Sequence, residues 1–267
     1  MLDRTGEWVN DAGTSFSAPI VARACAFLWR KLRDLGGGAV DPFGVTVKAC
    51  LALTAREPAT DEATQQLARV SYGFGYPDVD RWFAPTAEHA LFVWQGLLQA
   101  PNVQSRVQLP IPPQWLEDAA DPWLRVVWCW DPPVNPAAPK AWICRAVELQ
   151  VRPSNDEKAP ALPGVSPRQG KASLRSRDFK LKPINFGKSD ATPPADGIWT
   201  VHVTYTEIAE LPDATYSSYQ RVAVCAELVD RGGRASPQAA LQAMPFTASM
   251  NRLGARAAPL RVGVGAR

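Results

Sequence analysis

The uneven distribution of proline is the feature that most limits how this chain can fold. Only four prolines fall within residues 1–84, whereas fifteen fall between Pro110 and Pro194. Because proline removes a hydrogen bond from a helix interior and clashes with the preceding turn, this change in density indicates a change of architecture. The chain has 267 residues, enough for two domains. We predict a first domain over residues 1–84 and a β-rich domain over residues 87–230.

Two helices are predicted in the first domain. The segment Ser17–Leu35 is apolar on nearly all sides at its start and becomes amphipathic toward its end. Since an apolar helix surface needs cover from water, we expect the beginning of this helix to be buried and its end to be exposed. A second helix is expected from about Phe43 to Ala55, after the helix-start signal Asp41-Pro42.

Six short segments with a period of two residues follow the first domain. Trp199 and Val201, for example, alternate with Thr200 and His202, as in a half-buried antiparallel sheet. Such strands with proline-rich connections favour a β-sandwich or jelly roll. The expected strands are Ala90–Leu98, Arg106–Ile111, Leu124–Trp130, Ala146–Val151, Ile198–Tyr205 and Arg221–Val229.

The charge distribution indicates solvated segments rather than a binding surface. The net charge of +3 is too small to imply a nucleic-acid or membrane partner for the whole chain. Residues 152–194 are expected to form a long polar insertion loop; residues 168–188 within it are strongly basic, but aromatic residues that could stack on bases are sparse. After Asp230 the chain carries six arginines and no acid, so residues 231–267 are predicted to be an Arg-rich, partly disordered tail.

Cysteine and histidine usage limits the chemistry that the chain can perform. The five cysteines are widely spaced and contain no C-x-x-C pair, so neither a disulfide framework nor a zinc site is indicated and a reducing, cytoplasmic location is expected. His89 and His202 are the only two histidines, which excludes histidine-rich metal sites. The most apolar stretch, Ala18–Trp29, is too short to cross a bilayer.

The segment from Gly13 to Pro19, Gly-Thr-Ser-Phe-Ser-Ala-Pro, precedes the apolar helix and is the most informative motif in the chain. It places the Ser15 hydroxyl at a helix N-terminus, where unpaired N–H groups and the helix dipole can stabilise an oxyanion. Gly13 leaves room for a tight turn and a substrate carbonyl. The residues alone leave two interpretations open: a nucleophile, or an ordinary Ser/Thr helix cap.

The run Gly13–Ala22 closely resembles the nucleophile motif of the subtilisin-like serine peptidases, the subtilases, in which the serine opens a central helix. Ala49–Ala55 resembles the following helix of that family, and Gly73–Asp80 resembles the end of its catalytic domain. The resemblance covers about residues 1–84. It implies that Ser15 is the catalytic nucleophile, with Gly13 and Thr14 supporting the oxyanion and the turn.

The resemblance also implies a fold in two parts: the C-terminal part of a subtilisin-like α/β catalytic domain, mainly helical here, followed by an all-β sandwich or jelly roll. The segment Leu124–Pro133 resembles a recurrent strand and turn of the β-sandwich domains that follow some subtilase catalytic domains. Trp128 and Trp130 in this segment are expected to pack in a core rather than to form a ligand platform.

The other catalytic groups of the family do not match this sequence. Subtilases carry an acid, a histidine base and an oxyanion asparagine upstream of the serine. Only fourteen residues precede Ser15; they contain no histidine, and Asp11 lies too close to match the family's aspartate. We expect His89 and His202 to have surface or structural roles. Asp78 and Asp80 are expected to be turn and domain-closing residues.

The resemblance therefore implies a serine endopeptidase that cleaves polypeptide substrates through an acyl-enzyme and is inactive alone, until a separate or upstream segment supplies the Asp, His and Asn. The alternative is a non-catalytic protein-interaction module, in which the β-sandwich binds a protein partner and the motif is a remnant. No cofactor is expected. Calcium occurs in the family, but no site for it is identifiable in this sequence.

Overall fold

The computed structural model describes residues 14–35, 41–55, 78, 88–137, 143–153, 161–162, 179–186, 193–209, 211 and 219–244. This part of the chain contains seven strands and four helices, and strand is its main secondary structure. In the same part, no helix has the length and apolarity required to cross a membrane.

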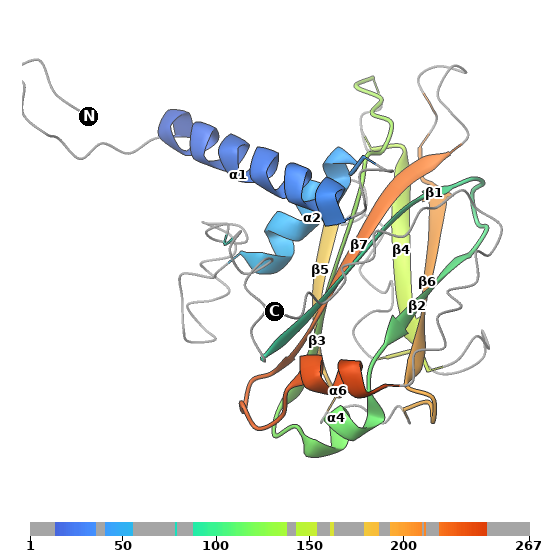
Figure 1. Ribbon diagram of the computed structural model, residues 1–267. Coiled ribbons are helices and arrows are strands. Elements are labelled where there is room, and N and C mark those ends of the chain that lie inside the picture. Colours follow the sequence, from blue (N-terminus) through green and yellow to red (C-terminus); the bar gives the residue numbers. More distant parts are fainter. Residues whose placement is uncertain are drawn as a thin grey trace, which may run out of the picture.

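The strands form two antiparallel sheets (Figure 1). They are β1 (His89–Leu98), β2 (Ser105–Pro110), β3 (Pro122–Trp130), β4 (Arg145–Arg152), β5 (Phe179–Asn185), β6 (Ile198–Glu207) and β7 (Gln220–Asp230). The four-stranded sheet has the order β1-β7-β3-β5, and the three-stranded sheet has the order β2-β6-β4. Successive strands therefore alternate between the sheets.

The two sheets pack face to face around a core rich in tryptophan. Trp128, Trp130 and Trp199 are at most 2% exposed. The indole N–H of Trp128 donates to the Val147 carbonyl at 3.1 Å. The indole N–H of Trp130 donates to the Arg145 carbonyl at 3.0 Å. Both bonds join β3 to β4 in the opposite sheet, so the prediction that Trp128 and Trp130 are core residues is confirmed.

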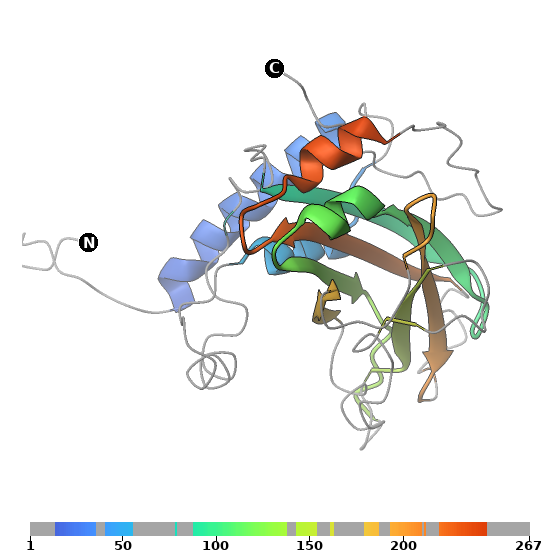
Figure 2. The ribbon, with the colours of Figure 1, turned by 90° about the horizontal axis from the view of Figure 1, so that it is seen from below.

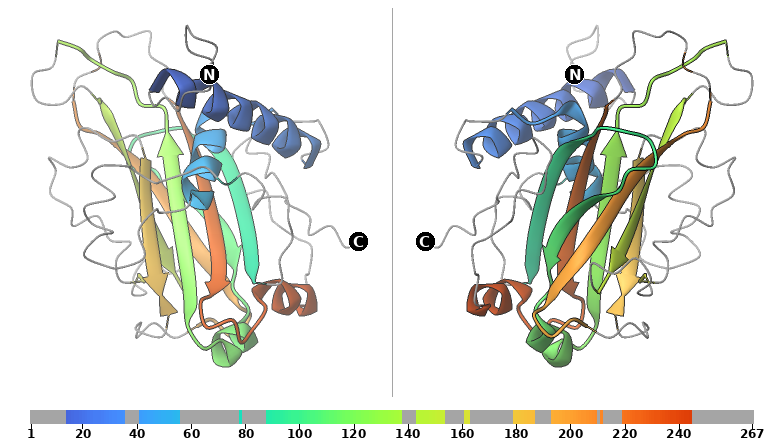
Figure 3. Two further views of the ribbon diagram at one scale, coloured as in Figure 1. Left: turned by 90° about the vertical axis from the view of Figure 1, so that its left-hand side faces the viewer. Right: turned by 90° about the vertical axis from the view of Figure 1, so that its right-hand side faces the viewer.

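Two helices, α1 (Thr14–Leu35) and α2 (Gly44–Thr54), form a layer on the outer face of the four-stranded sheet. α2 lies on β3 and β7, and α1 crosses α2 and projects away from the sandwich toward its N-terminal end (Figures 1 and 3). Leu28 and Leu32 of α1 pack into a core shared by the two helices and the sheet. Its other buried members are Val47, Ala49, Cys50, Ala52, Leu53, Val93, Val127, Cys129, Ala223 and Cys225.

The buried side chain of Gln95 holds the N-terminal end of α2 on β1. The side chain of Phe43, the N-cap residue, makes no capping hydrogen bond. Instead, Oε1 of Gln95 accepts from the Phe43 N–H at 2.9 Å and from the Thr46 hydroxyl at 2.6 Å. Its Nε2 donates to the Asp41 carbonyl at 3.1 Å. The amide of a sheet residue thus satisfies the Phe43 N–H, one of the backbone groups that a helix start normally leaves unpaired.

Replacing Gln95 with leucine is expected to lower the free energy of unfolding by about 2–3 kcal/mol, because the side chain is 2% exposed and both the buried Thr46 hydroxyl and the half-buried Phe43 N–H would lose their acceptor. Urea unfolding measures this change. Gln108→Leu is the matched control, since Gln108 lies exposed on β2 and should change stability by less than about 0.5 kcal/mol. Equal losses for both variants would contradict the anchoring role of Gln95.

Two short helices, α4 (Pro113–Asp118) and α6 (Pro237–Ala243), contact each other and close one end of the sandwich (Figure 2). The carboxylate of Asp230, 4% exposed, connects the segment that precedes β3 to the turn that follows β7. It accepts five backbone N–H bonds of 2.8–3.3 Å. The donors are Ala120, Asp121, Gly232, Arg234 and Ala235.

The predicted fold class was wrong. The expectation was a mainly helical remnant of an α/β catalytic domain followed by a separate all-β domain. In the structure, the described part is mostly β, and α1 and α2 share a hydrophobic core with the four-stranded sheet. The reason is that α2 is apolar on most sides, so it is buried between α1 and the sheet instead of lying within a helical unit.

The predictions for individual elements were more accurate. The helix expected at about Phe43–Ala55 is confirmed, since these residues cap α2. All six expected strands are confirmed as β1, β2, β3, β4, β6 and β7. The seventh, β5, was missed because it lies in the polar stretch 152–194 and contains Pro183, which disfavours strand interiors. A proline fits there because β5 is an edge strand.

Candidate functional site

The serine motif lies at the N-terminal end of α1. Thr14 is the first residue of the helix and Ser15 the second, so the backbone of both residues belongs to the first turn. N–H groups of a first turn have no partner within their own helix and form the positive end of its dipole. Gly13 and the side chains of Thr14 and Ser15 lie outside the part of the chain that the structure describes.

Pro19 changes the hydrogen bonding of this first turn. It lies inside α1, four residues after Ser15. Because proline has no N–H, the carbonyl of Ser15 lacks the hydrogen bond that a regular helix would give it. The backbone at Ser15 is therefore less constrained than the backbone later in the helix.

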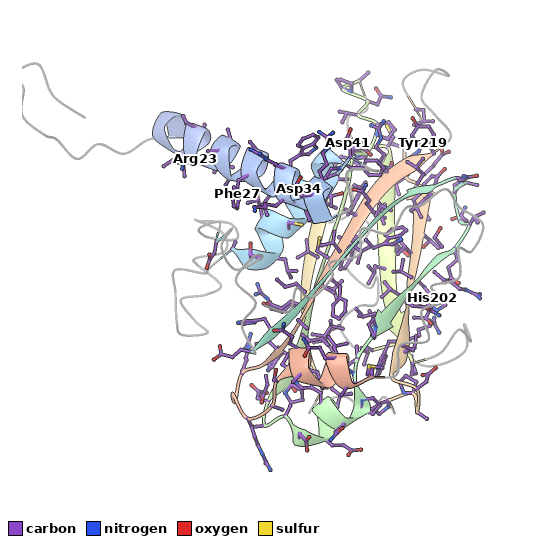
Figure 4. All side chains as sticks on the ribbon, in the orientation of Figure 1. Arg23, Phe27, Asp34, Asp41, His202 and Tyr219 are labelled. Atoms are coloured by element: carbon purple, nitrogen blue, oxygen red, sulfur yellow. The ribbon has the colours of Figure 1, made fainter. Side chains whose placement is uncertain are left out.

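The described side chains near the beginning of α1 are exposed although they are largely apolar. Residues 18–23 are all exposed, and Ile20 reaches 66%. Farther along, Phe27 is 41% exposed, and full burial begins only at Leu28 and Leu32. Figure 4 shows Arg23 and Phe27 on the helix that projects from the body. The prediction of a buried beginning was therefore wrong for residues 18–23, because the sheet and α2 cover only the later part of α1. The prediction of an exposed end is confirmed for the charged residues Arg30, Lys31, Arg33 and Asp34, which are exposed on the helix that buries Leu28 and Leu32.

A groove of about 520 Å³ lies between α1 and α2, beside their contact. Its lining comes from the two helices and is mainly apolar: Val21, Cys25, Ala26, Trp29, Gly44, Val47, Lys48 and Leu51. Two polar contacts fix the helices at the end of α1. The Trp29 indole N–H donates to the Pro42 carbonyl at 3.2 Å, and Arg33 lies 3.4 Å from the Asp41 carboxylate. An apolar groove beside an exposed apolar helix is typical of a surface that a protein partner covers.

His89 lies at the start of β1 and contacts a buried acid. Its Nδ1 is 3.1 Å from Oε1 of Glu227, whose side chain is 0% exposed. The other carboxylate oxygen of Glu227 accepts a hydrogen bond from Nη1 of Arg125 at 2.9 Å. Glu227 on β7 is aligned with Arg125 on β3, so the sheet register brings the two charges together. His89 therefore belongs to a polar cluster on the sheet, in which the half-buried side chains of Arg125 and His89 contact the buried carboxylate of Glu227.

His202 lies on the other side of the molecule. It is 2% exposed on β6, on the sheet face opposite Trp199 and Val201, which point into the core. α1 packs on the other sheet, so the sandwich lies between His202 and the helix that begins at Ser15 (Figure 4). This arrangement agrees with a structural role for His202 and argues against a role as the base for Ser15.

The predicted aspartates are only partly described. Asp78 is half-buried and is the one described residue of the Gly73–Asp80 motif. Asp11 and Asp80 lie outside the described residues. Within the described ranges, no group of three or more His, Cys, Asp or Glu side chains is placed to hold a metal ion.

Sequence reasoning missed two arrangements of chemically active groups. One is the polar cluster around Glu227; the other is a pair of cysteines, Cys50 and Cys225, whose sulfur atoms lie 3.7 Å apart. Both depend on contacts between residues that are more than 100 positions apart. A one-dimensional pattern contains no signal for such contacts, although a glutamate in the middle of the apolar β7 sequence could have been noticed as unusual.

No protein-family model matches the chain, and no curated protein matches it. The likeness to subtilases therefore rests on the motifs at Gly13–Ala22, Ala49–Ala55 and Gly73–Asp80 alone.

Proposed function

We propose that this chain carries the nucleophile segment of a serine endopeptidase of the subtilisin type, with Ser15 as the nucleophile. The observation that carries the proposal is the placement of Thr14 and Ser15 at the start of a helix whose residues 18–23 are largely apolar and exposed. A serine that only caps a solvated helix does not require an apolar helix surface. A helix that carries the nucleophile does require such a surface, because the polypeptide that supplies the acid and the base must pack against it.

In the proposed reaction, the Ser15 hydroxyl attacks the carbonyl carbon of a peptide bond after a histidine base has taken its proton. The oxyanion that forms lies near the first-turn N–H groups of α1, whose positive dipole end favours negative charge. The amine leaves with a proton from the histidine, and water then releases the acyl group from Ser15.

A second polypeptide segment has to bring the acid, the base and the oxyanion asparagine. His89 is engaged with the buried Glu227, and His202 lies beyond the sandwich. A serine hydroxyl without a base is a weak nucleophile at neutral pH. The proposed partner is therefore the Asp/His/Asn-bearing segment, and the exposed part of α1 is the surface that it covers.

A non-catalytic interaction module is the second candidate. The groove between α1 and α2 favours it, because an apolar groove can hold a protein segment without any chemistry. In that case the Ser15 hydroxyl has no chemical role in the first turn of α1, and its removal leaves partner binding nearly unchanged.

Co-expression of the chain with the polypeptide encoded directly upstream of it tests the peptidase proposal, with casein cleavage and labelling by a fluorophosphonate probe as readouts. Ser15→Ala is expected to lower cleavage by roughly 10⁴-fold or more and to remove the label. Ser17→Ala is the matched control, because it removes a hydroxyl from the same turn of the helix and should retain most of the activity.

Cleavage that persists in the Ser15→Ala variant, or a label that maps to another residue, would overturn the assignment of Ser15. Stable binding of the upstream polypeptide without any labelling would support the interaction module instead. The isolated chain is expected to show no strong labelling, since it lacks the base.

A further inference from the structure

Two buried cysteines meet where the helical layer contacts the sheet. Cys50 lies on α2 and Cys225 on β7, 175 positions apart, and their Sγ atoms are 3.7 Å apart. Both residues are 0% exposed. We propose that Cys50 and Cys225 are a site of reversible disulfide formation, which links α2 covalently to β7. This proposal does not depend on the function of Ser15.

The distance between the two sulfur atoms favours a disulfide at this site. A disulfide requires a separation of about 2.05 Å, so the sulfur atoms must approach by less than 2 Å, roughly what small rotations of two side chains can provide. Gln95 holds the start of α2 on the neighbouring strand β1, so Cys50 faces the sheet in a fixed position. Among the described residues, no third ligand joins the pair to make a metal site.

The register of the sheet disfavours a disulfide between Cys225 and Cys129, a second cysteine in the same hydrophobic core. Cys129 on β3 is aligned with Ala223, while Cys225 is aligned with Val127. Cys129 and Cys225 are therefore diagonal neighbours, for which the Cα atoms of an antiparallel pair are about 7–8 Å apart. Disulfides need Cα atoms closer than about 7 Å, so this pair cannot close without backbone movement. Cys129 is thus a natural internal control.

The chemistry requires an oxidant, and we assign this role to a small-molecule disulfide. One protein thiolate attacks the small disulfide, which forms a mixed disulfide and releases one small thiolate. The second protein thiolate then attacks the protein sulfur of the mixed disulfide and releases the other small thiolate. The two protein thiols lose two protons and two electrons in total, and the oxidant becomes two small thiols. A thiol reductant reverses both steps.

Burial controls when this reaction occurs. Desolvation and the hydrogen bond with Cys50 raise the pKa of Cys225 well above its usual value. Few thiolates exist while the helices are packed on the sheet, and the oxidant has no access to them. The first step therefore requires α2 to lift from the sheet, and repacking then brings the second thiol to contact distance. Oxidation therefore occurs only when α2 has moved away from the sheet. Once the disulfide has formed, it links α2 to β7 and prevents further opening.

The test exposes the full chain to oxidised glutathione, blocks the remaining thiols and maps the disulfides in a proteolytic digest by mass spectrometry. We expect a peptide that links Cys50 to Cys225. The oxidised chain should melt roughly 10 °C above the reduced chain, because the bond closes a loop of 175 residues in the unfolded state. The variants Cys50→Ala and Cys225→Ala should lose this shift, whereas Cys129→Ala should keep it.

Melting under reducing conditions shows whether each variant is folded before oxidation, and the linked peptide in the unmodified chain does not depend on any variant. A map in which Cys225 is linked to Cys129 overturns the proposal. A chain whose thiols all stay reduced, even after prolonged exposure, overturns it as well.

Discussion

Replacing Arg125 with methionine is expected to lower the free energy of unfolding by about 3–5 kcal/mol, because the Glu227 carboxylate then stays buried without its guanidinium partner. Glu227 is 0% exposed, and the Arg125 guanidinium donates to it at 2.9 Å. The methionine preserves much of the apolar stem of the arginine, so the loss reports mainly on the charge. Urea unfolding followed by fluorescence of the core tryptophans measures it.

The double variant Arg125→Met/Glu227→Leu is the control for this result. It removes both charges and leaves apolar side chains, so it should recover most of the stability lost in the single variant. His89 then loses its carboxylate contact, but it is half-buried and can reach water. If the single and double variants were equally destabilised, lost packing rather than an unpaired charge would explain the effect.

Replacing Asp230 with alanine is expected to lower the free energy of unfolding by about 3–4 kcal/mol, because five backbone N–H groups lose a charged acceptor. Asp230→Asn keeps the shape and one acceptor oxygen, and a smaller loss of about 2 kcal/mol is expected for it. Equal stability of Asp230→Ala and the unmodified chain would contradict this role.

The same residue makes stability depend on pH. Desolvation raises the pKa of Asp230, but hydrogen bonds from Asp121, Ala235, Arg234 and Gly232 outweigh it and lower the pKa from 3.8 to about 2. The carboxylate therefore contributes about 2 kcal/mol that is fully present above pH 3.8 and is lost as the pH falls through 2. Urea unfolding of the unmodified chain and of Asp230→Asn, from pH 6 down to pH 2, should show the difference between them shrink across this range.

Local patterns predicted most of the elements and little of their assembly. The alternation around Trp199 and the tryptophans at 128 and 130 was sufficient to place strands, because one face of each strand is buried in the sandwich. The burial of the beginning of α1 was predicted wrongly, because the burial of Ile20 and Leu28 depends on which surfaces pack on them and not on their hydrophobicity alone. The docking of α2 on the sheet depends on Gln95, a polar residue in a strand whose partner lies about 50 positions away.

The candidate site shows the same limit. The motif located Ser15 at a helix start, as an N-terminal helix signal can do without knowledge of the fold. The sequence could not say that His202 lies behind two sheets, because this depends on strand order. It also gave no indication that Glu227 has a guanidinium partner or that Cys50 has a thiol partner, because both contacts arise only from the sheet register and the helix docking.

The strand order has a consequence for how the chain folds during synthesis. Among the described strands β7 comes last in the sequence, yet it lies between β1 and β3 and beneath α2. Until residues up to Asp230 have been made, β1 and β3 have no common neighbour, and α2 lacks the strand that contributes Ala223 and Cys225 to its core. The helix that begins at the serine motif is synthesised well before β7, but the core that it shares with α2 and the sheet is complete only after β7 has been made. Folding of this kind is slow, since the contacts that stabilise it join distant parts of the chain.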